Sequence, residues 1–330
     1  MPQSRFDRAR GALLGLAVGD AIGTTVEFKP RGSFALLTDM VGGGPFRLLL
    51  GQWTDDTSMA LCLAVSLVEN GFDLHDQMQR YVRWHDEGYM SSNGRCFDIG
   101  IATSSALERF RRTGNPVAGS RNPGSAGNGS IMRLAPVPIH YLETPEQAIE
   151  MSAAQSTTTH QAPECLAACR LLAEVLVRAL QGSSKGDVLA PSRQTLPMSS
   201  ALQSVAQGYY KTRSEDQIKG SGYVVQSLEA ALWCFWRTES FEACVLLAAN
   251  LGDDADTTAA VRGQAGAGGL EHGRVCLHCG QPRLEARRFV PACPGLLPAR
   301  VCLPGPGSVR HVDPDRSRLG RRRGAPWQQH

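Results

Sequence analysis

Two short acidic clusters stand about two hundred residues apart in this chain of 330 residues. They occupy residues 54–57, with the sequence Thr-Asp-Asp-Thr, and residues 253–257, with the sequence Asp-Asp-Ala-Asp-Thr. Each cluster is followed directly by an apolar run that is compatible with a helix. Carboxylates packed this closely repel one another unless positive charge lies between them. The pair of clusters therefore predicts the two halves of one cation site.

Helix capping is the alternative interpretation of each cluster, because Thr and Asp are favoured at helix N-termini and their charge suits the positive end of the helix dipole. One residue is enough for a cap, however, and each further carboxylate in the same turn adds repulsion. We therefore predict that both clusters bind metal. Their hard oxygen ligands suit two Mg²⁺ or Mn²⁺ ions better than Zn²⁺. The predicted ligands are Thr54, Asp55, Asp56, Asp254, Asp256 and Thr257.

The elements that must position these clusters are predicted to be helices. Apolar residues recur at spacings of three and four along most of the chain before residue 269, and no run of alternating residues indicates a competing strand. Glycine-rich and polar segments at 41–45, 113–129 and 181–192 separate the helices. The predicted helical ranges are 8–18, 57–69, 74–86, 99–111, 145–155, 163–181, 223–236 and 241–249, with a further helix opening at 256.

The composition is that of a globular protein, because 42% of its 330 residues are hydrophobic, which is enough for a sizeable core. No stretch approaches the roughly 18 uninterrupted apolar residues of a membrane-spanning helix. The charged first ten residues are not followed by the apolar h-region of a secretory signal either. We therefore expect a cytoplasmic protein without a membrane partner.

Residues 269–330 differ in composition from the rest of the chain. They contain 11 Arg, no Lys, 4 acidic residues and eight of the 19 prolines, so they carry a net charge of +7 and the preceding residues −4. This composition is typical of disordered or irregular chain, and we predict a main domain at 1–268 and an irregular tail at 269–330. A basic nucleic-acid-binding arm is the alternative for the tail, although only Phe289 and Trp327 could stack on bases. We expect no nucleic-acid partner for the main domain.

Further motifs accompany the two clusters in a fixed order along the chain. Residues 19–23, with the sequence Gly-Asp-Ala-Ile-Gly, and Glu27 precede the first cluster. Residues 127–133, which begin Gly-Asn-Gly-Ser, and residues 159–160, Thr-His, lie between the clusters. Each motif is short, but the ordered set is specific, and with it residues 8–266 resemble the ADP-ribosylglycohydrolase family.

The resemblance implies a compact all-α fold whose cleft holds a binuclear magnesium or manganese centre, in an enzyme that hydrolyses the bond between ADP-ribose and its acceptor. Position by position, the six ligands named above match the family's metal ligands. Glu27 falls where some relatives have a catalytic or gating glutamate, and Asp98 resembles an acid that bacterial relatives use near the scissile bond. The implied substrate-binding residues are Gly127, Asn128, Gly129, Ser130 and His160.

The residue types at these positions suit cleavage of a glycosidic bond. Such a bond breaks through an oxocarbenium-like transition state, in which one carboxyl group protonates the leaving group and another group activates water. Metal ions would share this work by orienting the ribose hydroxyls and activating water, so the leaving-group proton falls to Glu27 or Asp98. Glycines at 127 and 129 would let backbone amides approach a diphosphate closely.

Single residues at the predicted binding site have structural alternatives. A Gly-Asn-Gly segment is often only a turn. His160 could cap or pack against a helix instead of contacting a ligand. Arg133 could pair with an internal acid instead of the diphosphate. The sequence leaves each of these alternatives open.

The leading functional prediction is an enzyme that releases ADP-ribose from an ADP-ribosylated protein or small acceptor, with ADP-ribosylarginine favoured. The first alternative is a metal-dependent phosphohydrolase of a nucleotide diphosphate, because paired metals also serve attack at phosphorus. The second is a non-catalytic, ADP-ribose-binding or crystallin-like relative, against which the intact acidic clusters argue. The products distinguish the two enzymes, since the first yields ADP-ribose and the second yields AMP.

Overall fold

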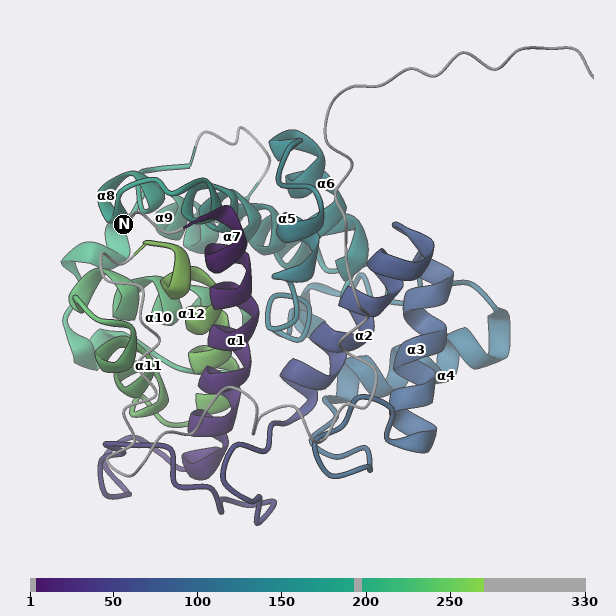
Figure 1. The fold of residues 1–330 in the computed structure, drawn as a ribbon, viewed down its shortest axis with the longest axis horizontal. Helices are drawn as coiled ribbons and strands as arrows, with labels where there is room; N and C mark the ends of the chain where they lie inside the picture. The colour runs from purple at the N-terminus through teal and green to yellow at the C-terminus, as the bar shows by residue number, and fades with distance from the viewer. Residues whose placement is uncertain (1–3, 193–197, 270–330) are drawn as a thin grey trace, which may run out of the picture. The chain divides into compact units, whose positions relative to one another are not determined.

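Helices form the computed structural model of the protein, which describes residues 4–192 and 198–269 (Figure 1). No β-strand occurs within these two ranges, where β-type pairing is limited to isolated bridges. The predicted all-α fold is therefore confirmed. The α-helices are α1 (Arg5–Gly23), α2 (Asp55–Asn70), α3 (Leu74–Glu87), α4 (Ile101–Thr113), α5 (Pro136–His140), α6 (Pro145–Ser156), α7 (Pro163–Gln181), α8 (Lys185–Val188), α9 (Ser200–Ala206), α10 (Val224–Arg237), α11 (Phe241–Ala249) and α12 (Ala255–Gly269). The 3-10 helices are η1 (Thr24–Val26), η2 (Pro123–Ser125), η3 (Tyr209–Thr212) and η4 (Glu215–Gln217).

The longer helices occur where the apolar spacing predicts them. The bounds of α7 and α11 are those predicted, and those of α2, α3, α4, α6 and α10 differ from the predicted ones by no more than two residues. The short helices α5, α8 and α9 have no counterpart among the predicted ranges. They contain 5, 4 and 7 residues, which is too few turns for a periodic pattern to be recognised.

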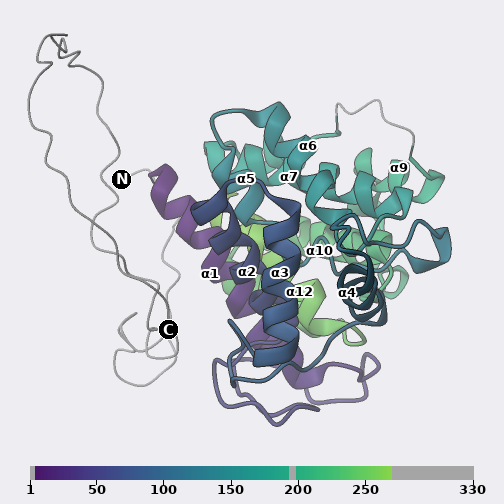
Figure 2. The same ribbon diagram turned by 90° about the vertical axis from the view of Figure 1, so that its right-hand side faces the viewer.

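The largest difference is at α1, which continues to Gly23, five residues beyond its predicted end, because it packs directly against α12. Gly15, Gly19 and Gly23 recur every four residues and so lie along one stripe of the helix. A Cβ atom on Gly19 would lie 2.2 Å from the carbonyl oxygen of Ala259, so only glycine allows this approach. Figures 1 and 2 show the two helices side by side. Asp20 of α1 lies near Asp256 at the start of α12.

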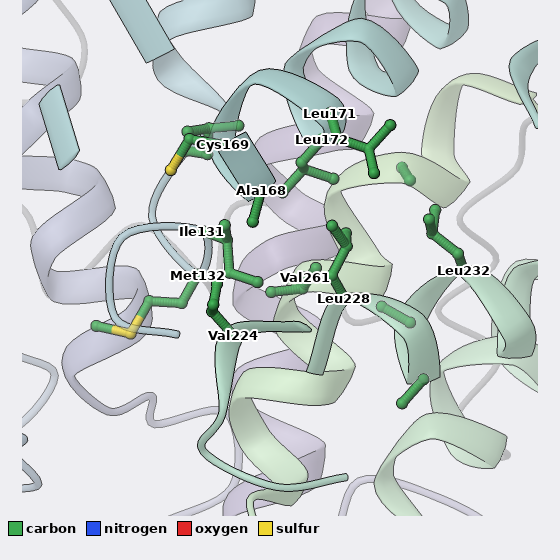
Figure 3. Packing of buried hydrophobic residues seen from close by; sticks show 14 of the residues in the cluster. Ile131, Met132, Ala168, Cys169, Leu171, Leu172, Val224, Leu228, Leu232 and Val261 are labelled. Carbon is green, nitrogen blue, oxygen red and sulfur yellow. The ribbon is translucent and has the colours of Figure 1, made fainter. Parts of the chain in front are cut away.

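The hydrophobic core joins α7, α10 and α12 to the segment that follows residues 127–130 (Figure 3). Ile131 and Met132 of that segment are buried in one cluster with Leu172 of α7, Leu228 of α10 and Val261 of α12. Fully burying one aliphatic side chain stabilises the folded state by about 1.5–3 kcal/mol. The core therefore anchors this segment against the helix that begins in the second acidic cluster.

The connections between α1 and α2 and between α3 and α4 are tied together beside the N-terminus of α2. The side-chain amide of Gln52 donates to the carbonyl of Ser92 at 3.0 Å. In return, the Ser92 hydroxyl donates to the carbonyl of Trp53 at 2.6 Å. These bonds fix the loop that carries Asp98 against the residues that lead into α2.

All described residues belong to one compact unit of the chain. The predicted boundary between residues 268 and 269 falls at the end of α12. Apart from Gly269, the predicted irregular tail lies outside the described residues, so the boundary and the tail stay predictions. Within the described ranges, no helix is both long enough and apolar enough to cross a membrane.

Candidate functional site

The N-termini of α2 and α12 lie against each other, and the two acidic clusters meet there. The hydroxyl of Thr54, just before α2, donates to the carboxylate of Asp256 in α12 at 3.2 Å. In the opposite direction, the hydroxyl of Thr257 donates to the carboxylate of Asp56 at 3.4 Å. All four side chains are at most 5% exposed. The structure thus brings together residues that stand 202 positions apart in the sequence.

Asp20 of α1 is a further acid in this site, and the predicted ligand set does not include it. Carboxylate oxygens of Asp20, Asp56 and Asp256 all lie within 4.8 Å of one another. Asp20 is fully buried, which is rare for a carboxylate that lacks partners. In the sequence, Asp20 is the single acid among the apolar and glycine residues at the end of α1, and this contrast could have identified it.

Glu27 and Asp98 approach the same site from two loops. Carboxylate oxygens of Glu27, Asp98 and Asp256 lie within 4.8 Å of one another. Glu27 follows η1 and is 5% exposed. Asp98 has a φ angle of 61°, in the left-handed region that residues other than glycine rarely adopt. Such a conformation persists only where the surrounding structure fixes it, and it is frequent at functional sites.

The concentration of buried carboxylates disfavours their ionisation. Burial, followed by repulsion from neighbouring carboxylates, raises the pKa of Asp55, Asp56 and Asp256 well above the ordinary value. Burial and the nearby Asp98 raise the pKa of Glu27 to about 10, and burial raises the pKa of Asp98 to about 7. Only an added positive charge would let these acids ionise together at neutral pH.

The donor atoms of the site fit a hard divalent cation. Oδ1 of Asp56, one of the predicted ligands, is buried and has no hydrogen-bond partner among the residues that the structure describes. A buried polar atom without a partner costs about 1–3 kcal/mol, a cost that a cation beside this oxygen would remove. Carboxylate and hydroxyl oxygens are the ligands that Mg²⁺ and Mn²⁺ prefer.

The Gly-Asn-Gly-Ser segment lies against the second acidic cluster. The side-chain amide of Asn128 donates to the carboxylate of Asp254 at 3.1 Å and to the hydroxyl of Ser227 at 3.3 Å. The backbone N–H of Asn128 donates to the carbonyl of Gly222 at 3.1 Å. Asn128 therefore orients Asp254, which is one of the predicted metal ligands and is partly buried.

His160 packs against the two glycines of this segment. A Cβ atom on Gly129 would lie 2.6 Å from Cε1 of the ring, and one on Gly127 would lie 3.2 Å from Nε2. Nδ1 shares a hydrogen bond with the hydroxyl of Thr159 at 2.8 Å. Burial, with a smaller effect from the charge of Arg133, lowers the pKa of His160 to about 3. The ring is thus neutral at physiological pH and supports the segment by packing.

Ser130 and Arg133 face the protein interior. The buried hydroxyl of Ser130 accepts a hydrogen bond from the thiol of Cys169 at 3.4 Å. Arg133 donates to the carbonyl of Gly129 at 2.8 Å and to the side-chain oxygen of Gln155 at 3.1 Å. The internal partners of Arg133 that the structure describes are thus neutral groups, which also include the sulfur of Met59 and the ring of Tyr81, instead of an acid. Both side chains hold the segment from the inside.

Three phenylalanines form an apolar patch beside the acids. The ring centroids of Phe28 and Phe46 are 6.2 Å apart, and those of Phe46 and Phe97 are 5.2 Å apart. Phe28 follows Glu27 in the chain, and Phe97 precedes Asp98. Nothing in the sequence singles out these residues, because three separate phenylalanines form no pattern. The patch offers an apolar surface against which part of a ligand could pack.

Comparison with known sequences relates this site to one family. A model of the ADP-ribosylglycohydrolase family matches residues 1–270. The chain is 52% identical over 264 residues to the ADP-ribosylarginine hydrolase Tri1 of Pseudomonas putida (strain GB-1), a match that covers 80% of this chain and 70% of that protein. It is 33% identical over 265 residues to the ADP-ribosyl-[dinitrogen reductase] glycohydrolase of Rhodospirillum rubrum, with coverages of 79% and 84%.

Comparison with solved structures identifies the same family. A solved structure described as an ADP-ribosylglycohydrolase-related protein complex is similar with a TM-score of 0.71 and 46% sequence identity. The similarity covers 79% of this chain and 87% of that one. The predicted family is confirmed by both comparisons, and the chain belongs to the ADP-ribosylglycohydrolase family of hydrolases.

Proposed function

We propose that this chain hydrolyses the N-glycosidic bond of ADP-ribosylarginine, in a protein or a small molecule, and that it uses two Mg²⁺ or Mn²⁺ ions to do so. One observation carries the proposal: α1, α2 and α12 bring carboxylate oxygens of Asp20, Asp56 and Asp256 within 4.8 Å of one another. The name of the P. putida relative, an ADP-ribosylarginine hydrolase, supports the choice of acceptor.

Residues at two helix starts would hold the ions. They are Thr54, Asp55 and Asp56 at the start of α2 and Asp254, Asp256 and Thr257 at the start of α12. Asp20, whose oxygens accept hydrogen bonds from Thr54 and Thr57, would orient the ligands at the start of α2. A divalent cation bound there supplies the positive charge that lets these carboxylates ionise together, and it acts as a Lewis acid toward the ribose oxygens.

Glu27 and Asp98 are the carboxyl groups that we assign to the leaving-group proton. Both lie within reach of Asp256, yet neither belongs to the predicted ligand set, so they remain available for proton transfer. The hydroxyl of a water molecule adds to the anomeric carbon of the ribose as the bond from that carbon to the arginine nitrogen breaks. The remaining water proton, passed on through one of these carboxyl groups, ends on the arginine nitrogen.

The diphosphate would lie along residues 127–130. The N–H groups of Gly127 and Asn128 already donate to the carbonyls of Ser125 and Gly222, so we assign the diphosphate to the N–H groups of Gly129 and Ser130, which glycine at 129 lets a ligand approach closely. Asn128 links the segment to the second acidic cluster. His160 supports the two glycines from behind. In this assignment the segment contributes backbone groups, while Ser130 stabilises it from the interior.

Release of ADP-ribose from matched acceptors tests the proposal. The chain, freed of metal with EDTA, would be incubated with ADP-ribosylarginine, ADP-ribosylserine and O-acetyl-ADP-ribose, each without metal, with Mg²⁺ and with Mn²⁺. We expect ADP-ribose from ADP-ribosylarginine only when a metal is present. AMP as the product would instead indicate a phosphohydrolase, and no product from any acceptor would indicate a binding protein.

A pair of matched variants tests the role of the acidic site. Asp56→Asn keeps the size of the side chain and removes its charge, and we expect it to lower kcat by about 100-fold or more. Asp187→Asn, at an exposed position in α8, is the control and should retain wild-type activity. Equal activity of the two variants would refute the assignment of the site.

A further inference from the structure

Arg31 binds three backbone carbonyls in two other segments of the chain. Its guanidinium donates to the carbonyl of Leu251 at 3.3 Å, to that of Glu215 at 2.6 Å and to that of Ile218 at 2.6 Å. Hydrogen bonds from a charged donor are stronger than those between neutral groups. Arg31 therefore joins the loop after α1 both to the residues before α12 and to the segment around η4.

The same loop touches the residues before α12 directly. Gly252 has a φ angle of 73°, and a Cβ atom there would lie 2.6 Å from the carbonyl oxygen of Lys29 and 2.9 Å from the backbone nitrogen of Arg31. Asp253 donates its backbone N–H to the carbonyl of Lys29 at 2.8 Å and accepts at its own carbonyl from the N–H of Phe28 at 2.7 Å. Residues 251–253 are thus held directly against residues 28–31.

Asp254 depends on both segments that Arg31 joins. Its backbone N–H donates to the carbonyl of Gly220, in the segment after η4, at 2.8 Å. A Cβ atom on Gly222 of that segment would lie 3.1 Å from Oδ2 of Asp254. The same oxygen accepts the hydrogen bond from Asn128 at 3.1 Å. The separation of the two segments therefore determines where the Asp254 carboxylate lies.

We propose that Arg31 is a positioning residue for Asp254 and that it sets the affinity of the α12 half of the site for a divalent cation. The inference rests on the proposed metal centre, in which Asp254 is a ligand. The guanidinium of Arg31 donates to carbonyl oxygens of segments around Asp254, whereas Asp56 is held by hydroxyls at the starts of α2 and α12. Loss of Arg31 should therefore release Asp254 and leave the α2 half in place.

Calorimetric titration of Mn²⁺ into the metal-free full chain tests this role. We expect Arg31→Gln and Arg31→Lys each to bind Mn²⁺ about tenfold more weakly than the wild type. Neither side chain presents the planar fork of donors with which Arg31 reaches carbonyls of two segments. Arg31→Lys keeps the charge and the aliphatic stem, so it carries the test if Arg31→Gln does not fold.

Arg8→Gln is the matched control. Arg8 also donates to a backbone carbonyl in another part of the chain, that of Leu180 at 2.7 Å, but it lies in α1 about three helical turns before Asp20. Its substitution should leave the affinity for Mn²⁺ unchanged. Urea unfolding of each metal-free variant would show whether the control and Arg31 variants lose similar stability, so that a change in affinity can be separated from general destabilisation.

The outcomes are distinct. Weaker Mn²⁺ binding in both Arg31 variants, with wild-type affinity in Arg8→Gln, supports the role. Wild-type affinity in the Arg31 variants, or an equal loss in Arg8→Gln, overturns it and leaves the proposed function standing. A wild-type chain that takes up no Mn²⁺ refutes the metal centre itself, and the role of Arg31 with it.

Discussion

Asp20 accepts two hydrogen bonds from Thr57, one from its backbone N–H at 3.0 Å and one from its hydroxyl at 2.6 Å. The other oxygen of Asp20 accepts from the N–H and the hydroxyl of Thr54. An acid of α1 therefore caps the first turn of α2, a role for which helices ordinarily use a residue of their own. The capped turn carries Asp55 and Asp56, so the packing of α1 and the geometry of the first acidic cluster are linked.

Asp20→Ala should lower the free energy of unfolding by about 2–4 kcal/mol, because it removes the cap and with it the acceptor of the backbone N–H groups of Thr54 and Thr57 and of the Thr57 hydroxyl. Urea unfolding of the metal-free chain measures this. Asp73→Ala provides the comparison, because Asp73 caps α3 through bonds to His75 and Asp76 only, at the protein surface. That variant should cost about 1 kcal/mol. Equal losses of unfolding free energy in the two variants would show that the cap provided by Asp20 stabilises the protein no more than a surface cap does.

Asp56→Asn should be at least as stable as the wild type when metal is absent. The substitution removes a buried carboxylate whose Oδ1 has no partner among the described residues, and with it the repulsion from neighbouring acids. Thermal unfolding in EDTA and in Mn²⁺ would measure both effects. Mn²⁺ at 100 times its Kd should stabilise the wild type by about 2.7 kcal/mol and the variant by much less. A variant that is less stable in EDTA, or equally stabilised by Mn²⁺, would contradict the metal assignment.

The neutral ring of His160 should make stability depend on pH. Burial lowers its pKa to about 3 from the ordinary 6.5, so between these values the unfolded chain binds a proton that the folded chain does not. The free energy of unfolding therefore falls as the pH falls below about 6.5, by up to about 1.4 kcal/mol per pH unit from this residue. His160→Gln should show a shallower fall between pH 6.5 and 4.5. An unchanged slope would mean that His160 takes up its proton in the folded state.

Two fully buried arginines should respond in opposite ways to replacement by methionine. Nε of Arg262 donates to the sulfur of Cys244, but both terminal nitrogens lack a hydrogen-bond partner among the described residues, and the guanidinium lies 4.3 Å from the ring centroid of Phe235. Arg133 instead donates to oxygens of several neighbours, including Gly129 and Gln155. Removing a buried charge whose terminal nitrogens have no partner relieves desolvation, whereas removing one that is fully hydrogen-bonded leaves its acceptors unsatisfied.

We therefore expect Arg262→Met to leave stability unchanged or to raise it by about 1–4 kcal/mol, and Arg133→Met to lower it by at least about 2 kcal/mol. Chemical unfolding of the two variants beside the wild type would decide this. A marked loss of stability in Arg262→Met would mean that the terminal nitrogens of the guanidinium have partners in the folded protein.

The parts of the site that sequence reasoning could predict are those whose local pattern is itself unusual. Several carboxylates in one turn conflict with simple capping, and this conflict alone marks residues 54–57 and 253–257. The helices that follow them carry apolar spacing long enough to be recognised, as at α7 (163–181). Local chemistry and periodicity therefore predict where the two clusters begin and that helices follow.

The remaining parts depend on contacts between distant segments. Asp20 belongs to the motif at residues 19–23, but its place beside Asp56 and Asp256 arises only when α1 packs on α12 through Gly19. The sequence suggests that Arg133 pairs with an acid or a phosphate. Its oxygen acceptors are instead hydroxyl, amide and carbonyl groups, and no sequence pattern predicts them. The contacts of Arg31 are to backbone carbonyls, which every residue possesses. No pattern of side chains could predict such partners.

The central claim is that the two acidic clusters form one metal-dependent site that releases ADP-ribose. The most direct test is the rate of ADP-ribose release from ADP-ribosylarginine by the EDTA-treated chain, before and after Mn²⁺ is restored, in the wild type and in Asp256→Asn. We predict release only after Mn²⁺ is restored and only in the wild type. Release at the same rate in EDTA, or by Asp256→Asn at the wild-type rate, would contradict the claim.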